Sequence, residues 1–510
     1  MGQENGRFSY STLAQDLALF GVRKARRIAA ILASIPIIAA FVCLDLVDYR
    51  PYFREPYYKT TIAALQRLPS TNQIVRGQLQ AGFGRARLTP EIGGTAEDPA
   101  NGRFRAIPMA GYGDRKGHPA EGVHDDLFVK AVALRVGHLT GIIFSSDALI
   151  VPREVADAAA TQLHQEFGLG REQLYFSATH THCGLGGWGE EFVGEAFAGK
   201  FHPGARTWMA TRFVSAAREA LGDLKPAEMS GSSFDEPRFI RNRLVGDLGR
   251  VNSEFNFLAI RQQNGRPGII GSYGAHATVL SGRVMEFSAD YPGYWQRAIE
   301  EATGGEALFV AGSVGSHAPV AGQGGFEGAE VMGKSLANGV LARLKTLTFT
   351  NTVTFSLTGL AVALPEYNVR LTDGLRLRPW VSGRLLKAPS GETFLQAFRF
   401  NDAVWISTPC DFSGELALDI KNLFRVRGFN ANITSFNGDY IGYVVRSRYY
   451  HMGGYEPQVM SFYGPYVPDY LDELIRGLAT VVTTDLSAPK AIPQAVSQPL
   501  VREQVLERAR

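Results

Sequence analysis

The sequence predicts an α/β fold, a layered mixed sheet flanked by helices, and three observations support this class. Short apolar runs alternate along the chain with amphipathic stretches of helical spacing, a pattern typical of sheets covered by helices. Several of the runs are apolar throughout, as expected for strands buried on both faces. Glycine is abundant, at 56 of 510 residues, which favours many tight connections between short elements.

The apolar runs give the predicted strands. They cover residues 127–136, 140–151, 173–180, 268–276, 307–315 and 403–412. Helices are predicted where apolar residues recur at helical spacing, at residues 153–167, 206–221, 294–302 and 328–345. Together these elements place one folded domain at residues 81–480.

Charge and cysteine content exclude two classes of protein. The net charge of +3 is too small to indicate nucleic-acid binding, and no basic stripe with interleaved aromatic residues is present. Three cysteines, Cys43, Cys183 and Cys410, are too few for a disulfide-framed scaffold. Cys183 and Cys410 stand beside candidate site residues, and a pairing between them is left open. The sequence gives no signal for the oligomeric state.

The N-terminal segment carries a targeting pattern. A basic run at residues 22–27 is followed by an uncharged apolar stretch at residues 28–44, near the short end of the roughly 17–25 residues that cross a bilayer. Because basic residues flank only its N-terminal side, the positive-inside rule predicts a single-pass membrane protein whose main domain is extracytoplasmic, periplasmic or extracellular. A cleaved signal peptide and a buried helix are the alternatives.

This pattern divides the chain into five segments. They are a cytoplasmic N-terminus at 1–27, a signal anchor or transmembrane helix at 28–46, an aromatic and basic juxtamembrane linker at 47–80, the main domain at 81–480 and a tail at 481–510. The tail is interrupted by prolines and ends in a charged sequence, and no chemistry is assigned to it.

Polar residues follow several of the predicted strands. His180 and His182 end one strand and share a face of an extended chain, while His276 and Asp411 end two others. In open α/β sheets, ligands bind outside the carboxyl ends of the strands. Imidazole and carboxylate ligands suit zinc, which keeps one position open in catalytic sites. We therefore expect a metal site or catalytic site at this edge.

Structural roles remain open for the same residues. A single histidine at a strand end is often a hydrogen-bonded structural residue. Asp411 precedes a predicted helix, where an aspartate also serves as an N-cap. Asp147, Asp439, Tyr440 and Tyr443 stand on or beside strands too, and the spacing of Tyr443 alone favours simple packing.

Several short segments resemble, in order, the neutral/alkaline non-lysosomal ceramidases. The segment ATHTHCGLGG at 178–187 is similar to the family's THTHSGPGG, and GFGRARLTP at 82–90 resembles its opening strand and turn. Further similar segments are IRNRL at 240–244, GAHATVL at 274–280, SADYPGYWQ at 288–296, TPCDFSGE at 408–415 and NGDYIGYVV at 437–445. The resemblance covers about residues 82–477 and corresponds to the family's N-terminal catalytic domain.

The resemblance implies a set of site residues. It implies a zinc ion, Zn²⁺, held by His180, His276, Asp411 and Tyr443, with Asp411 standing where the family has glutamate. His182 would lie beside the metal as a proton shuttle or transition-state stabiliser. Arg243 matches an arginine that contacts the substrate near the scissile amide.

One position departs from the family's pattern. The ceramidases carry a serine in GNLSP that is important for their activity, whereas SVGSHAP places Ala318 at this nucleophile position. Ser316 and His317, just before it, are candidate substrate-binding residues. A zinc-activated water needs no side-chain nucleophile, so hydrolysis remains compatible with Ala318.

The predicted function is a zinc-dependent amidohydrolase, a membrane-anchored ceramidase-like enzyme that cleaves an N-acyl sphingoid or another amphiphilic acyl substrate. A zinc esterase or amidase with a non-ceramide substrate is one alternative. Another is a catalytically silent relative that binds a lipid or glycan at the membrane surface. A metallophosphatase is disfavoured because the chain lacks the Asp/His/Asn clusters of a two-metal site.

Overall fold

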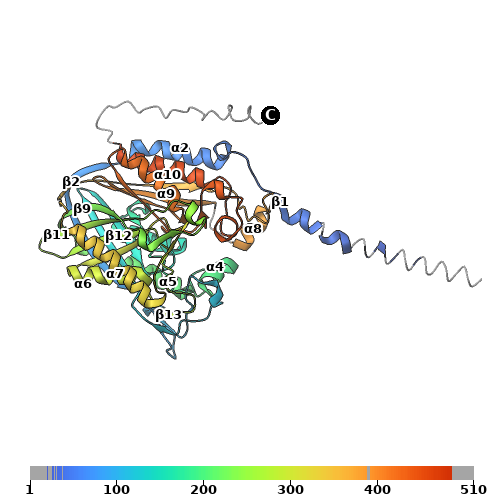
Figure 1. The fold of residues 1–510 in the computed structure, drawn as a ribbon, viewed down its shortest axis with the longest axis horizontal. Helices are drawn as coiled ribbons and strands as arrows, with labels where there is room; N and C mark the ends of the chain where they lie inside the picture. Colours follow the sequence, from blue (N-terminus) through green and yellow to red (C-terminus); the bar gives the residue numbers. More distant parts are fainter. Residues whose placement is uncertain are drawn as a thin grey trace, which may run out of the picture.

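A mixed sheet of twelve strands forms the centre of the protein (Figure 1). The computed structural model describes residues 38–386 and 391–484, together with residues 20, 24, 26–27, 29 and 32–36. In spatial order the sheet contains β14 (Glu306–Ala311), β12 (Pro267–Tyr273), β11 (Glu254–Gln262), β9 (Lys225–Asp235), β2 (Ile74–Arg87), β16 (Thr352–Ala363), β18 (Glu392–Phe400), β19 (Ala403–Ser407) and β21 (Asn430–Thr434). From β2 branch β6 (Phe128–Val136), β7 (Leu139–Ser146) and β8 (Leu174–Tyr175).

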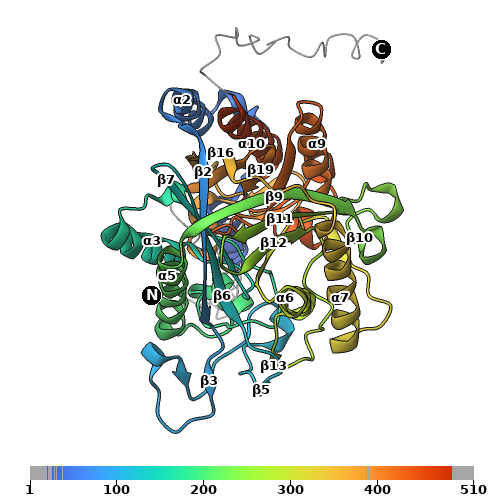
Figure 2. The same ribbon diagram turned by 90° about the vertical axis from the view of Figure 1, so that its left-hand side faces the viewer.

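Helices flank this sheet, which confirms the predicted fold class. One group comprises α3 (Arg153–Phe167), α5 (Pro203–Gly222), α6 (Asp290–Thr303) and α7 (Gly325–Leu344), and the other α2 (Pro56–Thr71), α9 (Gly414–Arg425) and α10 (Val467–Thr483). Three hydrophobic clusters of described residues lie between the layers. In the middle cluster the two halves of the sheet face each other, as where Tyr175 packs edge-on against Phe398. The result is a helix–sheet–sheet–helix arrangement (Figure 2).

The apolar patterns explain the buried faces of individual elements. On α3 the buried residues Val155, Ala156, Ala159 and Leu163 form one helical stripe. That helix ends at Gly168, whose φ of 69° suits the left-handed C-cap position. Every residue of β14 is buried, as its continuous apolar run predicted.

Parallel strand pairs bring the candidate site residues to one region. In the large sheet β7 pairs with β8, β12 with β14 and β19 with β21 in parallel, and α3, α6 and α9 form the respective crossovers. His180 follows β8, His276 follows β12 and Asp411 follows β19. The carboxyl ends of these strands therefore deliver the three side chains.

The remaining elements are short. Two-stranded pairs join β1 (Leu44–Leu46) to β17 (Leu375–Leu377), β3 (Glu91–Ile92) to β4 (Arg103–Phe104), β5 (Gly122–Val123) to β13 (Glu286–Phe287), β10 (Ile240–Asn242) to β15 (His317–Pro319) and β20 (Asp411–Phe412) to β22 (Tyr443–Val444). Two short helices, α4 (Glu191–Ala198) and α8 (Pro379–Leu386), contact each other beside the site. Single 3₁₀ or π turns occur at Tyr52–Arg54, Pro99–Asn101, Gly113–Arg115, Arg171–Gln173, Pro237–Phe239, Gly246–Leu248, Ser447–Tyr449 and Tyr455–Val459.

The N-terminal prediction needs a correction. Within the described residues, no helix combines the length and the apolar character that crossing a bilayer requires. The predicted transmembrane helix at 28–46 does not reach residue 46, because Leu44–Leu46 form β1 and pair with Leu375–Leu377. Residues 28, 30, 31 and 37 lie outside the described residues.

The ends of the domain also differ in the structure. Residues 47–80, predicted as a linker, include α2 and the first part of β2, which pairs with β16. The folded unit therefore includes part of that predicted linker. Helix α10 ends at Thr483, and of the predicted tail, residues 485–510 lie outside the described residues, as does most of the predicted cytoplasmic segment 1–27.

Candidate metal centre

Five polar side chains predicted from the sequence meet at one buried point. His276 Nε2 lies 3.2 Å from Asp411 Oδ1 and 3.2 Å from the Tyr443 hydroxyl. His180 Nε2 lies 3.9 Å from Asp411 Oδ1 and 3.2 Å from His182 Nε2. Ligand atoms of His180, His182 and His276 all lie within 4.8 Å of one another, so these three form a group able to hold a metal ion.

Backbone carbonyls orient two of the imidazoles. His180 Nδ1 lies 2.7 Å from the Leu149 carbonyl, and His276 Nδ1 lies 3.1 Å from that of Val314 and 3.0 Å from that of His317. A carbonyl only accepts, so each Nδ1 carries the proton and donates it. Each Nε2 therefore directs a lone pair at the centre, the arrangement that metal-ligating histidines adopt.

Burial keeps these imidazoles neutral. It lowers the pKa of His180 to about 3, with a further contribution from His276. Burial, followed by the positive charge of Arg243, also places the pKa of His276 well below its usual value. At neutral pH neither ring carries the second proton that would block its Nε2 lone pair.

The third acceptor at the centre is Asp411. Its Oδ1 is buried and accepts no hydrogen bond from the described residues. Two imidazole nitrogens and a carboxylate oxygen thus face one another at one buried point, an arrangement of acceptors that a cation would stabilise. The spacing of 3.2 Å between His276 Nε2 and Asp411 Oδ1 is close to the roughly 3.3 Å ligand separation in a tetrahedron with bonds of about 2.0 Å. The donor set fits zinc.

Strand pairing brings the carboxylate and the phenol together. Asp411 of β20 lies directly opposite Tyr443 of β22 in a parallel pair. Tyr440, three residues earlier, donates its hydroxyl to Asp411 Oδ2 at 2.8 Å, which leaves Oδ1 for the centre. The sequence placed Tyr440 beside this strand but gave no sign of its role.

His180 holds an uncommon backbone conformation. Its φ is 63°, in the left-handed region, and its ring stacks 3.8 Å from that of Phe436, whose φ is 65°. A non-glycine residue in this region costs roughly 1–3 kcal/mol, and such strain clusters at functional sites. The stacking and the Leu149 hydrogen bond hold the ring in place.

His182 differs from the other two histidines. Its Nδ1 is buried and has no hydrogen-bond partner among the described residues, so no backbone carbonyl orients this ring as it does those of His180 and His276. The ring packs 4.8 Å from that of Tyr112. At Gly111 a Cβ would lie 2.6 Å from His182 Cα, so the glycine allows this close approach. A ring without the supporting carbonyl that metal-ligating histidines usually have suits proton exchange better than fixed metal ligation.

Arg243 reaches the centre through Tyr443. Its Nη2 donates to the Tyr443 hydroxyl at 2.8 Å, and its Nε lies 2.9 Å from Glu456 Oε1. Arg243 is absent from the residues that line the adjoining pocket. The structure therefore places this guanidinium behind the phenol.

The predicted substrate-binding pair, Ser316 and His317, lies behind the site instead of in the pocket. Both are fully buried, and neither they nor Ala318 line the pocket. His317 Nε2 accepts from the Asn252 amide at 3.1 Å, and Ser316 Oγ accepts from the Gly414 amide at 3.1 Å. Since the His317 carbonyl also accepts from His276, this segment supports a candidate ligand.

The two cysteines near the site are not paired. Cys183 and Cys410 are both free and buried. Arg115 donates to Cys183 Sγ at 3.3 Å and to the His182 carbonyl at 2.5 Å. The arginine thus holds the turn that carries His182, and no disulfide is needed there.

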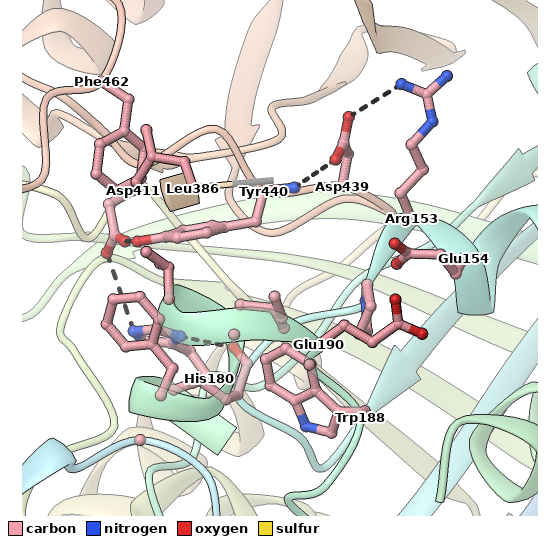
Figure 3. Close-up of a pocket in the computed structure, with 18 of the residues that line it drawn as sticks. Arg153, Glu154, His180, Trp188, Glu190, Leu386, Asp411, Asp439, Tyr440 and Phe462 are labelled. Atoms are coloured by element: carbon pink, nitrogen blue, oxygen red, sulfur yellow. Dashed lines mark hydrogen bonds and ion pairs between the residues drawn. The ribbon is translucent and has the colours of Figure 1, made fainter. Parts of the chain in front are cut away.

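A pocket of about 1190 Å³, including space open to solvent, leads to the centre. Figure 3 shows Asp411, Tyr440 and His180 at one end and Arg153, Glu154 and Glu190 at the other. The walls between are largely apolar and consist of Leu149, Ile150, Pro152, Trp188, Val193, Phe197, Leu386 and Phe462. Charged residues at the far end include Asp439, which approaches Arg153 at 3.9 Å.

The fold and the site together define an α/β protein with a candidate metal centre at the carboxyl ends of its strands. The fold is that of a neutral ceramidase. A crystal structure of neutral ceramidase from Pseudomonas aeruginosa superposes with a TM-score of 0.65 at 17% identity, over 82% of this chain and 76% of that one. A structure of ceramidase complexed with C2 gives a TM-score of 0.65 at 17% identity, over 81% and 77%.

Sequence comparison adds nothing to this likeness. The chain matches no protein-family model and no curated protein. The resemblance predicted from the short motifs is thus confirmed at the level of the fold, by the structures alone.

Proposed function

We propose that the protein is a zinc-dependent hydrolase of the neutral ceramidase type, which cleaves an amide in an amphiphilic acyl substrate. One observation carries the proposal: the acceptor atoms of His180, His276 and Asp411 converge at the end of a largely apolar pocket. The ceramidase fold supports the same reaction class.

In this proposal His180, His276, Asp411 and Tyr443 hold the metal. When bound, zinc supplies an activated water near neutral pH and polarises the substrate carbonyl. Asp411 contributes the negative charge of the ligand set, and Tyr440 fixes the orientation of that carboxylate through its 2.8 Å hydrogen bond.

His182 is the proposed proton carrier. Its Nε2 lies 3.2 Å from that of His180, next to the proposed ligands. Attack of water on the amide carbonyl releases a proton, and the leaving nitrogen must gain one as the carbon–nitrogen bond breaks. His182 transfers that proton, and general acid–base catalysis of this kind contributes roughly 100- to 10,000-fold.

Arg243 and Ala318 are both compatible with the proposed hydrolysis by water. Arg243 places a positive charge 2.8 Å from the Tyr443 hydroxyl, where it favours negative charge developing nearby. The methyl group of Ala318 offers no nucleophile, so the proposed reaction uses water alone.

The pocket favours a substrate with a long apolar part. An acyl chain would pack against residues such as Trp188, Phe197 and Leu386. Each CH₂ group buried there would contribute roughly 0.8 kcal/mol to the free energy of binding. We propose an N-acyl sphingoid as substrate, with another amphiphilic amide or ester as the alternative. From the N-terminal pattern we further propose that the domain is held at an extracytoplasmic membrane surface.

Hydrolysis of a fluorescent short-chain ceramide tests this function. We expect the wild-type protein to hydrolyse the ceramide, a chelator to abolish this turnover and added zinc to restore it. His180→Ala should show no turnover, with or without added zinc. Turnover of simple acyl esters without turnover of the ceramide would favour the alternative substrate class. Binding of the ceramide with no hydrolysis, equal in the wild type and in His180→Ala, would contradict the proposal and indicate a silent binding protein.

A further inference from the structure

Exposed apolar side chains lie on α4 and α8, two helices that line the pocket, and on the neighbouring strands β17 and β1. They are Phe192 of α4, 75% exposed, Trp380 and Leu385 of α8, 50% and 44% exposed, Leu375 of β17, 38% exposed, and Leu46 of β1, 71% exposed. We call these five residues the mouth surface. Exposed apolar groups on this scale carry a cost in water and mark interaction sites when they are contiguous.

The mouth surface is continuous with the pocket wall. Helix α4 places Val193 and Phe197 in the pocket lining, and α8 places Leu386 there. The same two helices contact each other and direct Phe192, Trp380 and Leu385 to the outside. Any apolar phase that covers these side chains therefore reaches the two helices that line the pocket.

The mouth surface also adjoins the apolar N-terminal stretch. β1 pairs with β17, which directly precedes α8. Before β1, the side chains of Ile35, Ile38, Phe41 and Val42 are exposed as well. Figure 1 shows β1, α8 and α4 at the same end of the molecule, from which the described N-terminal residues lead away.

Arginines accompany the aromatic residues on this side. The guanidinium of Arg384 lies 5.6 Å from the ring centre of Trp380, and that of Arg378 lies 5.7 Å from that of Phe41. Tryptophan with arginine is the combination that settles at the headgroup level of a bilayer, with the ring toward the acyl chains and the charge toward phosphate. This composition favours lipid over a soluble protein partner.

We propose that the mouth surface inserts into the interfacial region of a phospholipid bilayer, so that the pocket opens toward the membrane. This contact is distinct from the N-terminal anchor predicted from the sequence and does not rest on the proposed hydrolysis. An amphiphilic molecule then passes from the bilayer to the pocket along α4 and α8 without its acyl chain crossing water.

Tryptophan fluorescence tests the contact in the full chain. Of five tryptophans, Trp188, Trp208, Trp295 and Trp405 are buried, which leaves Trp380 as the exposed one. With vesicles of brominated phosphatidylcholine, whose bromines quench only on contact, we expect the Trp380 emission to be lost. Trp380→Phe should remove most of that loss, because Trp208, Trp295 and Trp405 are buried in the core and Trp188 is 5% exposed in the pocket wall.

Relocated tryptophans map the surface. In the Trp380→Phe background we expect bromolipid quenching of Phe192→Trp and Leu385→Trp. Leu248→Trp and Val426→Trp, at positions 92% and 83% exposed on other elements, should remain unquenched and serve as matched controls. The proposal is overturned if the four positions are quenched equally, if none is quenched, or if the mouth surface is instead shielded in a dimer that dissociates in Phe192→Ser. None of these readings depends on turnover.

Discussion

Asp411 and Tyr443 lie directly opposite each other in the parallel pair of β20 and β22, and both side chains are buried. Each strand has only two residues, yet this register brings a carboxylate and a phenol to the same imidazole, that of His276. A site assembled by so short a pair depends strongly on the identity of its side chains.

Replacing Asp411 should remove most of the zinc affinity. Asp411→Asn keeps the shape of the side chain but removes its charge, so we expect zinc affinity to fall more than about 100-fold. Loss of a hydrogen bond that only supports a ligand costs about 10- to 100-fold. Asp411→Glu, which restores the charge with a longer reach, should retain binding. Competition with a chromogenic chelator measures both, and unchanged affinity in Asp411→Asn would show that this carboxylate is no ligand.

Tyr440 should act on the metal through Asp411. Tyr440→Phe deletes the hydroxyl that holds Asp411 Oδ2, and loss of such a supporting hydrogen bond typically lowers metal affinity about 10- to 100-fold. The matched control is Tyr470→Phe, which deletes a hydroxyl bonded to the Ala363 carbonyl away from the site. Equal affinities of the two variants would refute the role assigned to Tyr440.

His182 should affect turnover but not zinc content. If it moves the proton, His182→Gln lowers kcat roughly 100- to 10,000-fold while the protein still purifies with zinc. His180→Gln, by contrast, should lose the metal. Elemental analysis and kcat, measured for both variants, distinguish a proton carrier from a metal ligand. Loss of zinc from His182→Gln would show that His182 is a ligand instead.

The stability of the zinc-free protein should decrease in acid. Burial lowers the pKa of His317 to about 4, against about 6.5 for an unfolded histidine. Between these values the unfolded chain binds more protons, so stability falls as pH falls from about 6.5 to about 4, by at most about 1.4 kcal/mol per pH unit for one histidine. His317→Asn should show a shallower dependence in urea unfolding than the wild type. The exposed His138→Asn is the control, and parallel slopes for all three proteins would contradict this assignment.

The sequence could predict the fold class because burial leaves a direct pattern. Residues 307–311 of β14 are apolar throughout, and α3 carries its apolar stripe at helical spacing. His180, His276 and Asp411 could be singled out for a similar reason, since polar residues directly after apolar strands stand out. Their convergence follows from parallel pairing, which that pattern suggests.

Other features had no readable pattern. Two-residue strands have no periodicity, so the register of Asp411 with Tyr443 could not be predicted, and Tyr443 depended on the family resemblance. Ser316 and His317 are polar, but nothing in their spacing distinguishes a pocket wall from the layer behind it. Asp45 interrupts the apolar run, but a strand of three residues has no periodicity of its own, so the start of β1 could not be predicted.

The central claim is that side chains from separate strands share one zinc ion, and direct titration tests it. Calorimetric titration of Zn²⁺ into chelator-treated wild-type protein should show stoichiometric binding that raises the melting temperature, since a ligand at 100 times its Kd adds about 2.7 kcal/mol of stability. His276→Ala should lose both effects. Binding and thermal shift that persist undiminished in His276→Ala would contradict the account.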